Sequence, residues 1–298
     1  MTLYTHQGEN IRKTWFLMTM FLVLVIAVGY GLSWYLGNPI IIYIAVGFAL
    51  FMNVFSYWYS DKIVLKMTGA KPVTREEYFD LYNIVENLSI TAGLPMPKVY
   101  IVNDPSPNAF ATGRNPEHAV VAVTTGLLQI LEKSELEGVV AHEMSHIGNR
   151  DMLVMTVAVV LAGFIAIVSD FFLRTLIWGG GNNRDRHPAF LILAIVGIIL
   201  APIAAQLIQL AVSRKREYLA DASGALLTRH PEGLASALEK ISTHAQPMQK
   251  ASHATAHLFI SDPFAEGKKR GIMQKIGGLF KTHPPAQDRI AKLRNKEV

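Results

Sequence analysis

The chain has 298 residues, of which 51% are hydrophobic and only 17% are charged, whereas a soluble domain usually carries about 25% charged residues. This composition excludes a wholly soluble protein and predicts that part of the chain lies in a lipid bilayer. The chain has no cysteine, which excludes disulfides and cysteine-based metal sites, and its net charge of +5 lies beside apolar segments, so we predict no nucleic-acid partner.

Residues 1–60 are predicted to form an N-terminal transmembrane hairpin. No charged side chain occurs from Thr14 to Ser60, a length that allows two spans of about 20 residues each. Gly37-Asn38-Pro39 interrupts this run near its middle, as a tight turn would. The apolar stretch is too long for a cleaved signal peptide, and a second span follows directly.

Residues 61–151 are polar and predict a folded unit with helices and a small β-sheet. Arg75–Ala92 has the periodicity of an amphipathic helix, whereas Lys98–Val102 and Ala119–Val123 are typical of strands. Ser134 and Glu137 have the spacing of a capping box. A helix is therefore expected to begin there and to end near residue 148.

Residues 152–212 contain two further apolar runs, Met152–Leu173 and Phe190–Val212. They predict a second hairpin that either spans the membrane or lies against it, and the sequence leaves both possibilities open. With the first hairpin, the total is about four transmembrane helices, followed by a second polar block over residues 213–298.

Basic residues predict the orientation of these spans. The first hairpin turn has no basic residue, whereas many flank the spans on the side of the polar blocks. These are Arg12, Lys13, Lys62, Lys66, Lys71, Arg150, Arg214, Lys215 and Arg216. Because cytoplasmic loops carry the excess of Lys and Arg, we expect a multi-pass membrane protein with both termini and both polar blocks in the cytoplasm.

The predicted helix ending near residue 148 contains His142-Glu143-Met144-Ser145-His146. Two histidines at i and i+4 share one helical face, about 5–6 Å apart at Cβ, so both imidazoles can bind one zinc ion. Glu143 lies beside the first histidine, where its carboxylate can take a proton from a water molecule. The pattern indicates a hydrolytic metal site.

A catalytic zinc needs a third protein ligand, and Glu217 is the candidate. Glu217 and Asp221 are again at i and i+4, so they share one helical face. If Glu217 binds zinc, Asp221 is expected to accept a hydrogen bond from a ligand histidine. The alternative is that Glu217 only forms an ion pair with Arg214 or Lys215. At 1.5 Å per helical residue, His146 and Glu217 lie within about 10 Å of the predicted membrane boundary, which favours membrane proteins as substrates.

The motifs Pro107–Gly113, His142–His146 and Arg214–Asp221, in this order, resemble those of the HtpX-type membrane zinc proteases. Ala256–Leu258 and Thr282–Pro285 extend the resemblance to nearly the whole chain. It implies an α-helical membrane protein with an α+β zincin-like catalytic domain, in which a small β-sheet lies beside the HExxH helix. The two polar blocks are then the two parts of this domain.

The resemblance also implies a function and further site residues. One zinc ion per chain would serve the hydrolysis of misfolded or damaged membrane proteins, as a stress response at the cytoplasmic side of the cell (inner) membrane. Asn108 would bind substrate beside an edge strand, for which we take Ala119–Val123. His283 would stabilise the tetrahedral intermediate, with support from Arg289.

Two alternatives stay open from the sequence. One is a specialised processing peptidase, such as an enzyme that trims prenylated C-termini. The other is a membrane chaperone or adaptor with structural zinc, in which Glu143 would have no purpose. His253 and His257 also have i and i+4 spacing, but without a nearby carboxylate pair we expect surface or packing roles. The sequence does not predict the oligomeric state.

Overall fold

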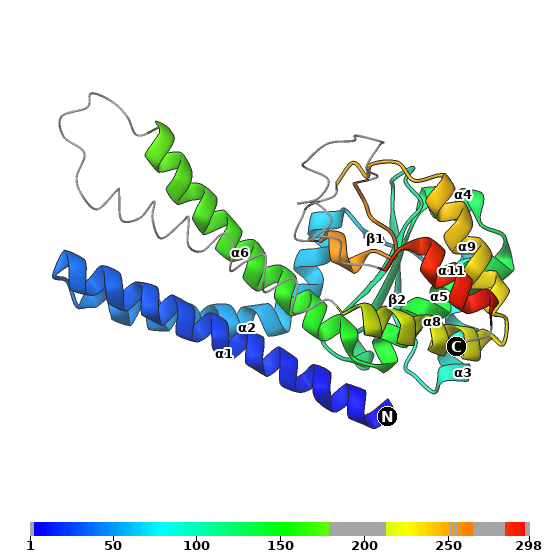
Figure 1. Ribbon diagram of the computed structural model, residues 1–298, viewed down its shortest axis with the longest axis horizontal. Helices are drawn as coiled ribbons and strands as arrows, with labels where there is room; N and C mark the ends of the chain where they lie inside the picture. The colour runs from blue at the N-terminus through cyan, green and yellow to red at the C-terminus, as the bar shows by residue number, and fades with distance from the viewer. Residues whose placement is uncertain (1–2, 179–212, 251, 253–254, 265–283, 296–298) are drawn as a thin grey trace.

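A computed structural model describes residues 3–178, 213–250, 252, 255–264 and 284–295. In this part of the chain, three long helices project from an α+β unit (Figure 1). Helices α1 (Leu3–Leu36) and α2 (Ile40–Thr68) form a hairpin, and α6 (Asp151–Trp178) packs against both. Three stretches of these helices are apolar and long enough to cross a membrane: Gln7–Leu36, Ile40–Thr68 and Asp151–Asp170.

The hairpin predicted from the uncharged run is present, and its turn lies at Gly37, where φ is +63°. Glycine adopts this conformation without steric cost. Helix α2 continues past residue 60 to Thr68 and ends where Gly69, with φ of +70°, bonds back to two carbonyls of the last turn. The predicted fourth span, Phe190–Val212, lies outside the described residues.

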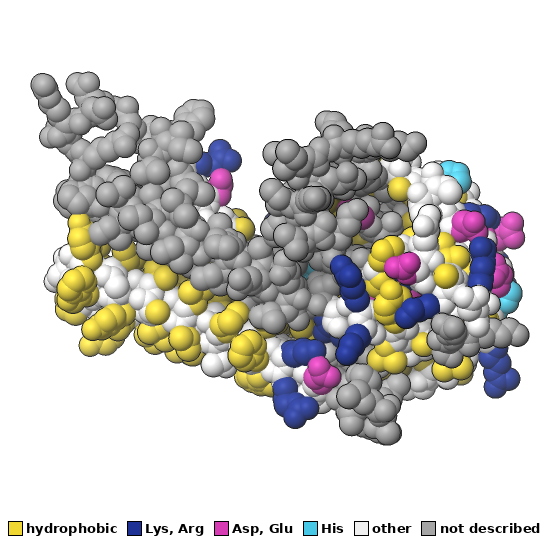
Figure 2. Space-filling view, in the orientation of Figure 1, with side chains coloured by type: hydrophobic (Ala, Val, Ile, Leu, Met, Phe, Trp, Pro, Cys, Tyr) yellow, Lys and Arg dark blue, Asp and Glu magenta, His cyan; other side chains and the backbone are white. Residues whose placement is uncertain are grey.

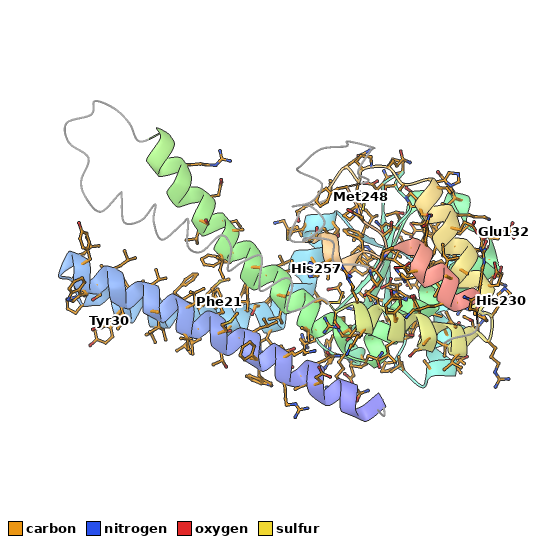
Figure 3. All side chains as sticks on the ribbon, in the orientation of Figure 1. Phe21, Tyr30, Glu132, His230, Met248 and His257 are labelled. Atoms are coloured by element: carbon orange, nitrogen blue, oxygen red, sulfur yellow. The ribbon has the colours of Figure 1, made fainter. Side chains whose placement is uncertain are left out.

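The three long helices share a core of their own. Phe21 on α1 is fully buried and meets Phe164 on α6 edge to face, with ring centroids 6.3 Å apart. By contrast, Tyr30 projects outward from α1 (Figure 3). Apolar side chains cover the outer faces of the α1–α2 hairpin (Figure 2), including exposed Trp34 and Tyr43. A surface of this kind is suited to lipid.

The α+β unit is built on a four-stranded mixed sheet in the order β1-β2-β4-β3. Strand β2 (Lys98–Val102) was predicted, and it pairs in parallel with β4 (Val120–Thr124). The outer strands, β1 (Lys71–Pro72) and β3 (Ala109–Thr112), both pair antiparallel to their neighbours.

The assignment of Ala119–Val123 as the edge strand is wrong. This segment is essentially β4, which lies between β2 and β3. The edge strands are β1 and β3, and β3 (Ala109–Thr112) is the one that contacts the HExxH helix α5. The sequence did not predict β3, because all four of its residues are buried and it therefore has no alternating pattern of polar and apolar side chains.

Helices cover the sheet and hold the core between them. Helix α3 (Phe79–Ala92) begins four residues later than predicted, because residues 75–78 form turns. Helix α5 (Lys133–Gly148) runs through the middle of the unit and contacts α3, β3 and three later helices: α8 (Arg214–Thr228), α9 (Pro231–Thr243) and α6. The remaining elements are α4 (Thr125–Ile130), α11 (Ala286–Arg294), η1 (Pro116–His118) and η2 (Ala256–Leu258).

The capping box of α5 differs from the predicted one. Glu132 is the N-cap, and the side chain of Glu135 accepts a hydrogen bond of 2.7 Å from the backbone N–H of Glu132. The Ser134–Glu137 assignment was therefore wrong by two residues, because a glutamate replaces the usual Ser or Thr at the cap. At its other end, α5 is joined to the membrane helix α6 by only Asn149 and Arg150.

Candidate metal centre

Helices α5 and α8 bring three predicted ligands together in a buried cluster. The two Nε2 atoms of His142 and His146 are 3.2 Å apart. A carboxylate oxygen of Glu217 lies 3.9 Å from Nε2 of His142, and the other lies 3.6 Å from Nε2 of His146. All three side chains are almost completely inaccessible to solvent, so Glu217 is not the surface partner of Arg214 or Lys215 that the alternative required.

The donor set and its spacing fit a tetrahedral divalent ion such as zinc. Zinc binds imidazole nitrogen and carboxylate oxygen at about 2.0–2.2 Å, which places donor atoms of a tetrahedral site about 3.4 Å apart. The ligand atoms of His142, His146 and Glu217 lie within 4.8 Å of one another and approach this spacing. Three protein ligands leave a fourth position for water or substrate, as catalytic zinc sites do.

Gly224 allows α8 to approach α5 this closely. A Cβ atom at Gly224 would lie 3.0 Å from the backbone nitrogen and 3.2 Å from the Cα atom of His142. Any larger residue would press against the backbone of a ligand. The need for glycine at position 224 is not visible in the sequence, because it arises from a contact between distant segments.

Asp221 orients the first histidine. Its Oδ1 atom lies 3.0 Å from Nδ1 of His142, so Nδ1 carries the proton and Nε2 is left as the metal-binding nitrogen. Arg289 of α11 donates two hydrogen bonds to Asp221, at 2.6 and 2.8 Å. Burial raises the pKa of Asp221, but Arg289 and His142 outweigh it and hold that pKa down at about 2.

Asp151 has the same relation to the second histidine. Its Oδ2 atom lies 3.1 Å from Nδ1 of His146. In the sequence, Asp151 is only the last residue before the apolar run, and no role in the metal site was predicted for it. Arg150, with φ of +59°, turns the chain so that the first residue of α6 faces back to the end of α5. An arginine whose backbone adopts the left-handed conformation cannot be recognised from the sequence, so this turn was not predicted.

The two histidines differ in their affinity for protons. Burial lowers the pKa of His142 to about 4, and the positive charge of Arg289 adds to this effect against the opposing Asp221. Burial also disfavours the charged form of His146, but Asp151 and Glu217 prevail and raise its pKa to about 9. A cation in the site would displace the proton of His146, because a metal ligand must be neutral imidazole.

Glu143 lies beside these groups, and its side chain is 2% exposed. Burial raises its pKa to about 7, and the charge of Glu217 acts in the same direction. The charge of His146 acts against them, as do the charge of Arg289 and a backbone hydrogen bond from Ala111. A base with a pKa near the working pH is well suited to accept and return a proton. The contact with Ala111 places this base next to the edge strand β3.

The outer edge of β3 is paired with the chain's own segment Phe259–Ser261. The N–H of Ile260 donates to the carbonyl of Ala109 over 2.9 Å. The side-chain amide of Asn108 binds both backbone groups of Ser261, donating over 3.0 Å and accepting over 3.2 Å. Arg289 donates to the carbonyl of Ile260 over 3.2 Å. The segment Phe259–Ser261 therefore lies against the end of β3, with Asn108 and Arg289 bound to its backbone.

Two other predicted residues need separate mention. His283 lies outside the described residues, so its expected support by Arg289 stays a prediction. Arg289 itself binds Asp221. Of the histidine pair near the C-terminus, His253 lies outside the described residues. His257 is buried, with Nε2 at 3.4 Å from the carbonyl oxygen of Met155, and Figure 3 shows it next to the membrane helices.

Comparison with known proteins assigns the chain to a family. A sequence model of Peptidase family M48 matches residues 76–297, which include the HExxH motif, Glu217 and Asp221. The chain belongs to peptidase family M48. It is an HtpX-type membrane metalloprotease, because relatives named as HtpX proteases align with 95–100% of the chain, with about half of the residues identical. The alternative of a chaperone or adaptor without proteolysis has no support from this family.

The curated relatives of this M48 protease come from distant organisms. A protein named "Protease HtpX homolog" from Caldanaerobacter subterraneus subsp. tengcongensis is 49% identical over 305 residues, covering 100% of this chain and 99% of the relative. One of the same name from Pyrococcus furiosus is 50% identical over 284 residues, covering 95% and 94%. The crystal structure of S. mikatae Ste24p has the same fold, with a TM-score of 0.51 at 16% identity, over 97% of this chain and 67% of that one.

Proposed function

We propose that this M48 protease is a zinc-dependent endopeptidase that hydrolyses internal peptide bonds of misfolded or damaged membrane proteins at the cytoplasmic face of the cell (inner) membrane. The observation that carries the proposal is the convergence of His142, His146 and Glu217, from two distant segments, with Glu143 beside them. The donor set contains no sulfur and has the geometry that zinc prefers.

The chain's own residues supply most of the mechanism. Zinc bound by the three ligands would lower the pKa of a water molecule to about 7 and polarise the scissile carbonyl. Glu143 removes the proton from the attacking water, whose oxygen bonds to the carbonyl carbon. Glu143 then delivers the proton to the amine as the C–N bond breaks. We assign to His283 a hydrogen bond to the developing oxyanion, by resemblance to the family.

The segment along β3 supports a mode of substrate binding. The backbone of Ser261 is bound by the side chain of Asn108, and Ile260 pairs with Ala109. An extended peptide that replaces this segment would make the same contacts, since strand addition uses only backbone groups. Asn108 would then fix one peptide unit of the substrate while Glu143 acts next to Ala111.

The position of the site supports membrane proteins as substrates. Helix α5 ends two residues before α6 begins, so His146 lies close to the start of a candidate span. Lys13 lies on the cytoplasmic end of α1 and Lys66 on that of α2 in the proposed orientation, whereas the hairpin turn at Asn38 has no basic neighbour. Peptide bonds near the bilayer surface would thus reach the site first.

The proposal is tested with purified full-length protein in detergent and an unfolded membrane protein as substrate. We expect zinc-loaded protein to cut the substrate at internal positions and chelated protein to be inactive. Glu143→Gln should keep one zinc per chain but lose about three or more orders of magnitude in rate, because it removes the proton acceptor. Cleavage by Glu143→Gln at the parent rate would refute the role of Glu143. Cuts confined to the C-terminus would instead indicate the processing peptidase.

A further inference from the structure

The cytoplasmic end of α1 contacts the end of the HExxH helix. Gln7 donates to the carbonyl oxygen of Gly148 over 2.7 Å, and Asn10 donates to that of Asn149 over 3.0 Å. The last carbonyls of a helix have no partner within it, so these two side chains of α1 act as a cap for α5. The capping residues precede the uncharged run and are separated from the end of α5 by about half of the chain length.

Asn10 also reaches the carboxylate that orients His146. Its Nδ2 atom donates to Oδ1 of Asp151 over 2.6 Å, while Oδ2 of the same carboxylate holds Nδ1 of His146 at 3.1 Å. The other atom of the amide, Oδ1, accepts a hydrogen bond of 3.1 Å from Arg216, the residue before Glu217. Nε of Arg216 lies 3.5 Å from Asp151. One amide therefore joins both ligand-bearing segments.

These contacts are shielded from water. Asn10 is 3% exposed, Asp151 is 0% exposed and Arg216 is 7% exposed. A buried hydrogen bond to a charged group is stronger than one at the surface, and removing one partner leaves the other without solvation. Without the Asn10 side chain, the Asp151 carboxylate would keep only Arg216 and His146 as side-chain partners, so it and the imidazole of His146 would be held less firmly.

We propose that Asn10 is a positioning residue of the metal centre, through which the first membrane helix contributes to metal retention. The inference rests on the zinc site of the proposed function. The partners that orient ligand histidines typically change metal affinity by 10–100-fold when they are removed. Asn10 binds Asp151 and not the histidine itself, so we expect its loss to lower metal affinity by about tenfold, near the lower end of this range.

The test measures zinc release from the full-length protein in detergent after addition of excess chelator. The variants are Asn10→Ala, Asn10→Asp, Asp151→Asn and the double variant Asn10→Asp/Asp151→Asn, with Arg12→Ala as a control at an exposed position of the same helix. Cobalt absorption spectra of the same variants report the ligand geometry. Both readouts are independent of proteolysis.

We expect about tenfold faster release from Asn10→Ala and an altered cobalt spectrum, with Arg12→Ala like the parent. Asn10→Asp should be worse than Asn10→Ala, because two carboxylates then meet at about hydrogen-bond distance. The double variant restores one amide and one carboxylate, and should release zinc more slowly than either of its single variants. A role in packing alone would give no such recovery.

Three results would count against the inference, and they are distinguishable. Zinc release and cobalt spectra that are unchanged in Asn10→Ala would exclude a positioning role while leaving the zinc site intact. A parent protein that binds neither zinc nor cobalt would overturn the proposed metal site itself, and this inference with it. Additive effects in the double variant would also exclude the direct coupling between Asn10 and Asp151.

Discussion

At the scale of single residues, each ligand histidine is paired with a carboxylate from another turn or helix. Asp221 holds His142, and Asp151 holds His146, both through Nδ1. The arrangement leaves the two Nε2 atoms facing each other. Both rings are thus held in the orientation that a cation needs before it binds, which lowers the cost of ordering the ligands.

Glu217 is the ligand whose loss should affect metal binding most directly. Glu217→Gln keeps the shape of the side chain but removes the negative charge that balances the cation, so we expect zinc affinity to fall by about tenfold or more. Zinc content at buffered free zinc concentrations measures this effect. Lys215→Gln, at an exposed position of the same helix, is the matched control. Equal zinc content in Glu217→Gln and the parent would contradict the assignment.

Sequence spacing predicted those residues of the metal centre that lie one helical turn apart on the same helix. His142, Glu143 and His146 follow from the i and i+4 rule, and the Glu217–Asp221 pair follows from the same rule on α8. Asp151 and Asn10 were missed, because no spacing pattern links them to the ligands. Asp151 reaches His146 only because Arg150 reverses the chain, and Asn10 comes from a helix about 140 residues away.

At the scale of secondary structure, α5 is the element to which the site is attached. Near its start, Glu135 accepts hydrogen bonds from Ser236 and Lys240 of α9, at 2.6 and 2.8 Å. Near the HExxH motif, the backbone of α8 approaches at Gly224. Along with the cap from α1, these contacts fix α5 at several points along its length.

Gly224→Ala tests the approach of α8. The added methyl group would lie 3.0 Å from the backbone of His142, so α8 must move away by a few tenths of an ångström and carry Glu217 with it. We expect zinc affinity to fall about fivefold, or roughly 1 kcal/mol, although alanine favours the helix itself. The control is Leu226→Ala at an exposed position of α8. Unchanged zinc affinity would show that the helices adjust without cost to the site.

The contact between Glu135 and Lys240 should make stability depend on pH. Burial raises the pKa of Glu135, but hydrogen bonds from Lys240, Ser236 and the Glu132 backbone lower it below its ordinary value. A carboxylate with a lowered pKa stabilises the fold above the unfolded pKa of about 4.3, and this contribution is lost as the pH falls through the folded value.

We therefore expect Lys240→Met to lower the melting temperature by a few degrees at pH 7, equal to about 1 kcal/mol or less, because Lys240 is partly exposed. The difference from the parent should shrink as the pH falls below about 4. Thermal unfolding in detergent across this pH range measures it, with the exposed Lys133→Met as control. A difference that stays constant with pH would contradict the role of the charge.

The elements that the sequence predicted are those with a strong local pattern. The uncharged run gave the α1–α2 hairpin, and apolar periodicity gave most of α3. Strand β3 was missed because its four buried residues lie between loops and show no alternation. The edge position was then assigned to the wrong strand, since strand order depends on pairing between distant segments rather than on local pattern.

At the scale of the whole molecule, the catalytic unit and the membrane helices are joined at the metal centre. Helix α6 follows α5 after two residues, α1 contributes Asn10, and α8 supplies Glu217. In Figure 1 the N-terminus lies beside the α+β unit, whereas the hairpin turn lies at the far end of the long helices. A protease built in this way keeps its site at a fixed distance from the bilayer.

This arrangement predicts opposite sides of the membrane for two exposed positions. Because the chain has no cysteine, Asn38→Cys in the hairpin turn and His118→Cys in the α+β unit each introduce a single thiol. An impermeant maleimide should label His118→Cys in inverted membrane vesicles only. Asn38→Cys should be labelled only in vesicles of the original orientation, because the distribution of basic residues predicts that the α+β unit lies in the cytoplasm.

The same vesicles provide the control for this experiment. Detergent must expose both thiols equally, so a difference between the two orientations reflects the membrane and not burial. Labelling of both positions from one side would mean that the α1–α2 hairpin does not span. The reverse labelling pattern would put the metal centre on the non-cytoplasmic side. The protease would then act on the parts of membrane proteins that are exposed on that side.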